Sequence, residues 1–206
     1  MLVLTNFVLK LHGMYQIKIA IFASGSGTNA ENIAEFFKIN NHIKVSLILS
    51  NKNSAYVLER ARKLSIANLS FTADELYNSS LVDSMLKECS IDAIVLAGFM
   101  IKVPDRLIEQ YRGRIINIHP ALLPKFGGKG MYGMNVHKAV IESGEKESGI
   151  TIHLVDEHYD NGKVLFQKSC VVEEGETPES LAAKIHELEY RYFPEVIGRY
   201  LTETVG

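Results

Sequence analysis

An asparagine and a histidine stand two positions apart at the end of one apolar run. In "RIINIHPA", Asn117 and His119 alternate with isoleucines, so a strand would point both polar side chains from one face, about 6.6 Å apart. Pro120 cannot continue a strand ladder, which places His119 at the carboxyl end, where open α/β sheets bind ligands. Both side chains can donate hydrogen bonds to an oxygen that gains negative charge, as acyl transfer requires. The alternative, a buried histidine beside an asparagine that caps the next turn, stays open on this octapeptide alone.

A second polar cluster lies further along the chain, in "HLVDEHYDNGKVLFQ". It contains Asp156, Glu157, His158 and Asp160, and such a stretch is most often a solvated turn. If it folds over the strand edge, one carboxylate would pair with His119, raise the histidine pKa and fix the ring orientation. Asp156 and Asp160 are equally good candidates on this ground.

A glycine-rich turn between the first strand and the first helix predicts a phosphate site. Glycines let backbone N–H groups approach an anion, and the helix N-terminus adds its positive dipole end. The candidate residues in "IFASGSGTNAENI" are Gly25, Ser26, Gly27, Thr28 and Asn29.

The same turn matches the dinucleotide pattern G-x-G-x-x-[GA], through Gly25, Gly27 and Ala30. An NAD site also needs an acid near the end of the second strand, and residues 50–53 read Ser-Asn-Lys-Asn instead. A nicotinamide dehydrogenase is therefore disfavoured. A turn that only packs a helix onto a strand remains an alternative.

Alternating elements must position these groups. Runs of strand length recur at 18–24, 44–51, 92–100, 114–119, 149–155 and 163–172. Helical patterns separate the first four, at 29–38, 54–64, 74–88 and 103–113. Such β/α alternation predicts an α/β doubly wound domain with a mostly parallel sheet and a Rossmann-like first turn.

A final helix is expected over 177–201. Thr177 can cap it, Pro178 suits its first turn, and Glu179 complements the helix dipole. Pro194 is expected to kink or interrupt this helix near its end.

Composition excludes several classes of protein. Lys and Arg total 22 against 24 for Asp and Glu, so a nucleic-acid partner is disfavoured. Two cysteines without metal spacing argue against zinc and fit a reducing, cytoplasmic setting. Apolar runs are too short for a membrane helix. We expect an N-terminal extension over 1–16, with Met1 or Met14 as the start, and a single domain over 17–206.

Five motifs together resemble the phosphoribosylglycinamide formyltransferase family, the folate-dependent transformylases of purine synthesis. They are "FASGSGTNAENI", "IVLAGFM", "INIHPALLPKF", "GITIHLVDEHYDNG" and "IHELEYRYFP", in family order and spacing over about residues 17–200. The resemblance implies the formyltransferase fold and formyl transfer from 10-formyltetrahydrofolate to glycinamide ribonucleotide. Because neither cysteine lies in a motif, we expect no metal and no covalent enzyme intermediate, and we expect either a monomer or a homodimer.

The resemblance also implies roles for individual residues. The catalytic set is Asn117, His119 and Asp160, the last raising the pKa of the histidine and helping to move the proton. The phosphoribosyl group would contact Gly27, Thr28, Asn29 and Glu189, together with Gly25 and Ser26 of the predicted phosphate turn. The folate would contact Met100, Ile101, Lys102, Val103, Asn117, Asp156 and Asp160.

The chain departs from the family pattern in two places. The segment 126–135 is longer and has four glycines, which predicts a mobile lid over the folate. An arginine that contacts folate has no counterpart in "SFTADELYNSS".

Three alternative functions would each account for some of these motifs. Two other formyl-folate enzymes share the catalytic trio, but the tRNA formyltransferase adds a C-terminal domain and the hydrolase an N-terminal one, and we expect room for neither. A non-catalytic nucleotide-binding module would keep the turn and not use the other motifs.

Overall fold

The computed structural model describes residues 16–40 and 42–205. The expected extension over 1–16 therefore lies outside the described residues, apart from Gln16. The described part forms a seven-stranded sheet in the order β3-β2-β1-β4-β5-β6-β7. Its strands are β1 (Ile17–Phe22), β2 (Ile43–Ser50), β3 (Ala67–Ser70), β4 (Ala93–Leu96), β5 (Ile115–His119), β6 (Glu147–Leu154) and β7 (Val164–Val171).

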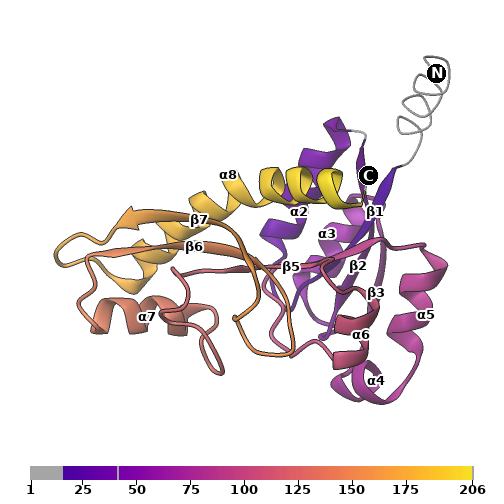
Figure 1. The fold of residues 1–206 in the computed structure, drawn as a ribbon, viewed down its shortest axis with the longest axis horizontal. Coiled ribbons are helices and arrows are strands. Elements are labelled where there is room, and N and C mark those ends of the chain that lie inside the picture. Colours follow the sequence, from indigo (N-terminus) through magenta and orange to yellow (C-terminus); the bar gives the residue numbers. More distant parts are fainter. Residues whose placement is uncertain (1–15, 41, 206) are drawn as a thin grey trace, which may run out of the picture.

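Helices lie on both faces of this sheet (Figure 1). They are α2 (Thr28–Ile39), α3 (Tyr56–Lys63), α4 (Ala73–Asn78), α5 (Leu81–Glu88), α6 (Asp105–Gln110), α7 (Met134–Glu142) and α8 (Pro178–Thr204). The first five strands are parallel, whereas β6 runs antiparallel to both β5 and β7. The predicted doubly wound α/β class with a mostly parallel sheet is confirmed.

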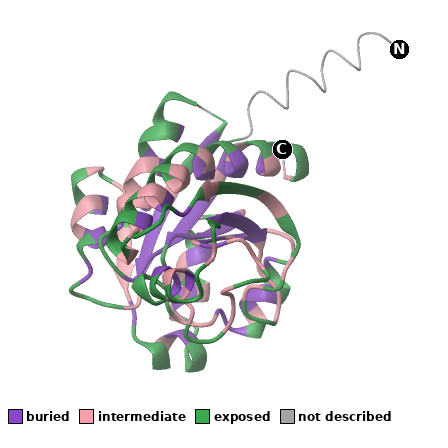
Figure 2. Ribbon diagram, turned by 90° about the vertical axis from the view of Figure 1, so that its left-hand side faces the viewer, coloured by how far each residue is buried: buried purple, intermediate pink, exposed green. Residues whose placement is uncertain are grey.

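Residue alternation along the strands decides which helices cover which face. In β1, Ile19 and Ile21 pack in one core cluster with residues of α2, α3 and α8, whereas Ala20 and Phe22 pack in a second with α4, α5 and α6. Because both faces are covered, the strands of the parallel part read as continuous apolar runs. Figure 2 shows the buried residues concentrated in this central sheet.

The structure adds details that the sequence patterns missed. Strand β3 was not predicted, and it lies at the sheet edge, paired with β2 alone. The helical pattern over 74–88 forms two helices. A capping box between Thr72 and Glu75 starts α4, which ends at Asn78, and α5 begins at Leu81. The segment 126–135 is not loop throughout, since α7 begins at Met134.

Helix α8 begins as predicted and ends differently. Thr177 Oγ1 accepts a hydrogen bond from the Ser180 N–H at 3.1 Å, which confirms the cap. Of the two expectations for Pro194, the interruption is wrong, because α8 continues to Thr204, and the kink stays a prediction. Proline removes the bond to the carbonyl four residues earlier, that of Tyr190. Asn32 of α2 donates to this carbonyl at 2.8 Å and so provides a new partner.

Candidate active site

The segments that follow three parallel strands enclose one cavity of about 730 Å³. Residues that line the cavity follow β1, follow β4 and lie at the end of β5. The strand order reverses between β1 and β4, and open α/β sheets bind ligands at such a switch point. The sequence-predicted site residues all line this cavity: Gly25, Ser26, Gly27, Thr28, Asn29, Met100, Ile101, Lys102, Val103, Asn117, His119, Asp156, Asp160 and Glu189.

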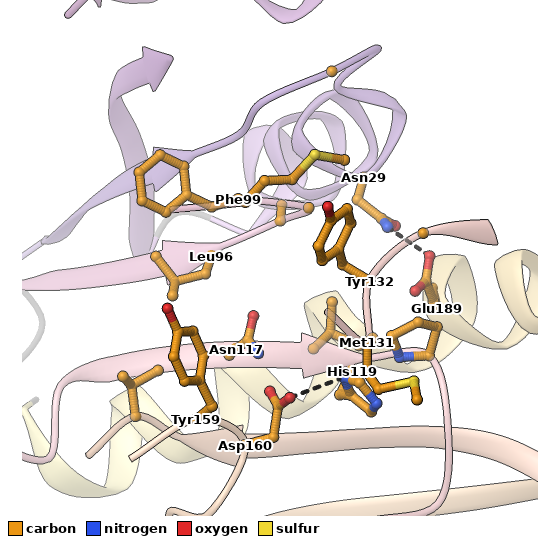
Figure 3. A pocket seen from close by; sticks show the side chains of 18 of the residues that line it. Asn29, Leu96, Phe99, Asn117, His119, Met131, Tyr132, Tyr159, Asp160 and Glu189 are labelled. Atoms are coloured by element: carbon orange, nitrogen blue, oxygen red, sulfur yellow. Dashed lines mark hydrogen bonds and ion pairs between the residues drawn. The ribbon is translucent and has the colours of Figure 1, made fainter. Parts of the chain in front are cut away.

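Asn117 and His119 leave the same face of β5, as the alternation predicts, and Figure 3 shows both beside Asp160. Asn117 pairs across the sheet with His153 of β6. Nδ1 of His153 donates to the Leu154 carbonyl at 2.8 Å, so Nε2 carries the lone pair in the neutral ring. Nδ2 of Asn117 donates to this Nε2 at 3.1 Å, which fixes the orientation of the amide. Burial lowers the pKa of His153 and favours this neutral form.

His119 is buried between the loop that follows β5 and the second polar cluster. Its Nε2 lies 2.7 Å from the carbonyl oxygen of Phe126, so Nε2 carries a hydrogen and donates it. Its Nδ1 lies 3.6 Å from Oδ2 of Asp160. A proton on Nδ1 would therefore face a carboxylate.

The structure separates the two candidate acids. Asp160 reaches His119, and its Oδ1 also lies 3.7 Å from Nε2 of His153. Asp156 instead accepts hydrogen bonds from the N–H of His158 at 2.8 Å and from Nδ2 of Asn161 at 3.2 Å. Asp156 thus orders its own turn, although it lines the cavity.

The glycine-rich turn forms one end of the cavity. Gly27 has a φ of 75°, and a Cβ there would lie 2.3 Å from Cγ2 of Val57, so only glycine fits. Arg60 donates to the carbonyl of Ser26 at 2.9 Å and supports the turn from outside. At the same end of the cavity, Oε2 of Glu189 on α8 accepts a hydrogen bond from Nδ2 of Asn29 at 2.7 Å (Figure 3).

Asn51 stands where a dinucleotide enzyme would hold ribose hydroxyls with an acid. Its Oδ1 accepts a hydrogen bond from Ser24 Oγ at 2.5 Å, and Ser24 Oγ accepts from the N–H of Met100 at 2.9 Å. These bonds join the turn after β1 to the segment after β4. They engage the Asn51 side chain in the protein, which further disfavours the NAD reading.

The opposite end of the cavity is apolar. Figure 3 shows Leu96 and Phe99 on the other side of the view from Asn29 and Glu189. Phe99 packs edge-on against Phe22 with ring centroids 5.3 Å apart, which holds its ring in place. The carbonyl of Lys102 accepts a hydrogen bond from the Tyr77 hydroxyl at 2.7 Å, which anchors the segment 100–103. A flat aromatic ligand would fit against this wall.

The glycine-rich loop from Phe126 to Gly133 lies over the cavity and contacts both candidate catalytic groups. The Phe126 carbonyl accepts the His119 hydrogen bond, and the Gly128 N–H donates to Oδ2 of Asp160 at 2.8 Å. A Cβ at Gly127 would lie 2.6 Å from Leu123 Cδ2 and 3.3 Å from Asp160 Cβ. The loop backbone therefore approaches Asp160 closely.

Sequence reasoning missed three histidines that line the cavity: His137, His153 and His186. His153 stands two positions after Thr151 in "GITIHLV", and both leave the polar face of β6. The same alternation that identified Asn117 could have identified His153. The other two lie on helices that bring them to the cavity only after folding.

Comparison with known proteins agrees with this geometry. Residues 17–197 match the formyl transferase family. The chain belongs to this family. Among named relatives, it is 41% identical to a chloroplastic phosphoribosylglycinamide formyltransferase of Arabidopsis thaliana, over 91% of this chain and 66% of the relative. It is 36% identical to the phosphoribosylglycinamide formyltransferase of Bacillus subtilis, over 89% and 94%.

Solved structures extend this likeness to the fold. The crystal structure of phosphoribosylglycinamide formyltransferase from Bacillus halodurans has a TM-score of 0.80 at 38% identity, over 89% of this chain and 95% of that chain. The resemblance seen in the five motifs is thus confirmed. The chain spans a little under two thirds of the length of the Arabidopsis relative.

Two further features concern the described residues alone. None of the helices in 16–40 and 42–205 is both long and apolar enough to cross a membrane. Within the same ranges, no three His, Cys, Asp or Glu side chains are grouped so as to hold a metal ion. Metal independence, the cytoplasmic compartment and the choice between monomer and homodimer stay predictions.

Proposed function

We propose that this protein transfers the formyl group of 10-formyltetrahydrofolate to the amine of glycinamide ribonucleotide, a step of purine synthesis. The observation that carries the proposal is the convergence of Asn117, His119 and Asp160 on one wall of the cavity, between the glycine-rich turn and the apolar wall. One end suits a phosphate and the other a flat aromatic ring. The named relatives support this choice of substrates.

The phosphoribosyl group would lie at the glycine-rich turn. Backbone N–H groups of Gly25, Ser26 and Gly27, with the N-terminus of α2, would receive the phosphate. Glu189 is held by Asn29 and would accept bonds from ribose hydroxyls. This placement directs the amine toward His119.

The folate would lie against the segment 100–103 and the turn that contains Asp156. The apolar side chains of Leu96, Phe99 and Val103 would cover the ring. This position brings the formyl carbon to the polar face of β5. Lys102 and Lys129 line the cavity as cations, and no arginine in the described ranges lines it.

The amine attacks the formyl carbon and gives a tetrahedral intermediate with a negatively charged oxygen. Asn117 keeps a second amide hydrogen after its bond to His153, and this hydrogen would stabilise the oxyanion together with the His119 ring. Each such donor is worth about 10²–10³ in rate. Collapse of the intermediate then releases tetrahydrofolate.

A proton acceptor is needed because an α-amino group with a pKa of about 8 is mostly protonated at neutral pH. Asp160, with a water molecule, is our candidate for this acceptor. Its carboxylate lies 3.6 Å from Nδ1 of His119, so it would also stabilise a protonated ring. The proton lost by the amine would pass through this pair to the leaving nitrogen of the folate.

The loop 126–133 would act as a lid. In the present conformation Nε2–H of His119 donates its hydrogen bond to the Phe126 carbonyl. This bond must break before Nε2–H can donate to an oxyanion. Entry of folate would displace this carbonyl and, with it, the Gly128 bond to Asp160. Folate binding would thus change the hydrogen bonds of both His119 and Asp160 through the movement of this loop.

A spectroscopic assay of the purified protein with both substrates tests the proposal. We expect tetrahydrofolate to form with glycinamide ribonucleotide and not with amine acceptors that lack the phosphoribosyl group. Equal turnover of simple amines would contradict the proposed substrate, and hydrolysis without formyl transfer would indicate the hydrolase reaction. A titration with NAD that produces no binding would eliminate the dehydrogenase alternative.

A further inference from the structure

Helix α7 brings His137 to the cavity, and this histidine has no role in the mechanism above. His137 is 6% exposed and lines the cavity wall. Its Nδ1 is buried and has no hydrogen-bond partner. Buried polar side chains are rarely left without a partner, so each such case needs an explanation.

Some of the unpartnered buried side-chain atoms belong to residues that line this cavity. The described residues contain four such side-chain atoms, in Asn29, Ser46, His137 and Ser148. Only Asn29 and His137 among these four line the cavity. Asn29 belongs to the proposed phosphoribosyl site, and the His137 ring makes no hydrogen bond to any described residue, so its Nε2 is also available to a ligand.

His137 lines the same cavity as Glu189 and His119, and its helix α7 packs against α8, which carries Glu189. Burial lowers the pKa of His137 most, while the charge of Glu189 raises it and that of His119 lowers it. Glu189 lies at the proposed ribose position, and His119 lies at the reacting carbon. His137 therefore faces the part of the substrate that joins ribose to amine.

The tautomer of the neutral His137 ring determines which of its nitrogens can donate a hydrogen bond. An unpaired buried N–H is rarer than an unpaired acceptor, so the neutral ring carries its proton on Nε2 and leaves the lone pair on the buried Nδ1. Nε2–H is then an uncharged donor at the cavity wall. An uncharged donor suits a carbonyl oxygen.

We infer that His137 is a further substrate-binding residue, which donates a hydrogen bond from Nε2 to the amide carbonyl of glycinamide ribonucleotide. This bond would fix the rotation of the amide link and direct the terminal amine toward His119. The inference rests on the proposed function for the identity of the substrate. It adds a contact for the amide between the phosphoribosyl site and the catalytic trio.

Three substitutions test the inference. His137→Leu removes the ring nitrogens at similar volume, His137→Gln keeps an N–H donor close to the Nε2 position, and His137→Asn places its amide near the Nδ1 position. Lys138→Gln is the matched control, because Lys138 is the next residue of α7, is exposed and does not line the cavity. The readouts are the KM values for both substrates, kcat, the dissociation constant for glycinamide ribonucleotide and the thermal midpoint.

We expect His137→Leu to raise the KM and the dissociation constant for glycinamide ribonucleotide about tenfold, the effect of one lost hydrogen bond. The KM for the folate should stay within about twofold, since the folate lies beyond His119. His137→Gln should retain most of the affinity and His137→Asn should not. The thermal midpoint of the Leu variant should stay the same or rise, because an unpartnered polar group is removed from a buried position.

The outcomes separate this inference from the proposed function. If His137→Leu binds glycinamide ribonucleotide as tightly as the wild type, His137 is a core residue and the inference fails alone. If the wild type binds this nucleotide and the Leu variant binds it weakly, the inference stands even where no formyl transfer is detected. A wild type that neither binds nor formylates it would overturn both.

Discussion

Nδ2 of Asn117 donates a hydrogen bond to Nε2 of His153 across 3.1 Å, between neighbouring antiparallel strands. The bond exists because His153 is neutral and presents a lone pair at Nε2. It determines which atoms of the Asn117 amide face the cavity. His153 is therefore a positioning residue for the proposed oxyanion site.

We expect His153→Leu to lower kcat about tenfold with little change in either KM, because the Asn117 amide loses its orientation while both substrate sites stay intact. His153→Gln, which keeps a polar side chain near the amide, should recover part of the rate. Steady-state kinetics on the three proteins checks this. An unchanged kcat in the Leu variant would show that Asn117 needs no partner on β6.

The glycine-rich turn offers a matched pair of substitutions. Gly25 has open space, since no atom beyond its chain neighbours lies within 4 Å of a Cβ added there, whereas a Cβ on Gly27 would overlap Val57. Gly27→Ala should therefore lower the free energy of unfolding by about 1–3 kcal/mol, from overlap and backbone strain.

Gly25→Ala should leave the stability nearly unchanged and raise the KM for glycinamide ribonucleotide, because the methyl group would crowd the approach of a phosphate. Chemical denaturation and the KM for each substrate measure the two effects. Equal affinity in the Gly25→Ala protein would place the phosphate elsewhere.

Two buried histidines predict how stability depends on pH. Burial lowers the pKa values of both His137 and His153 below the ordinary value of 6.5. In the unfolded chain both rings take up protons as the pH falls through about 6.5, while in the folded protein they stay neutral to lower pH. The unfolded state then binds more protons, so stability is complete above about pH 6.5 and is lost as the pH falls toward the folded pKa values.

The loss has an upper limit of about 1.4 kcal/mol per pH unit for each ring. Urea denaturation between pH 7 and 5 measures this slope for the wild type and for His137→Leu. We expect a shallower slope in the variant, because one proton uptake site is gone from the unfolded chain. Parallel slopes would mean that His137 does not contribute.

The sheet could be predicted from the sequence because the parallel strands are buried on both faces and read as apolar runs. Strand β3 could not, since its four residues "ANLS" are half polar and lie at the edge. Helix α7 follows a run of glycines, which favours a loop reading up to its first turn.

The candidate site was predictable to a similar degree. Strand alternation alone indicated that Asn117 and His119 share a face. The choice of Asp160 over Asp156 depends on the fold of one turn, in which Asp160 adopts a φ of 52°, a conformation that residue spacing does not encode. The five motifs selected Asp160 only through family resemblance.

Asp160 and His119 are the two groups on which the proposed formyl transfer to glycinamide ribonucleotide depends. Asp160→Asn preserves the shape of the side chain and its contact with the Gly128 N–H while removing the negative charge. Asp156→Asn is the control, because Asp156 bonds only within its own turn. His119→Ala removes the ring itself.

The most direct test is the rate of tetrahydrofolate formation from 10-formyltetrahydrofolate and glycinamide ribonucleotide, with dissociation constants for both substrates measured on the same proteins. We predict that Asp160→Asn and His119→Ala each lose about 10²-fold or more in kcat while binding persists, and that Asp156→Asn loses much less. Near-wild-type turnover in either Asp160→Asn or His119→Ala would contradict the account.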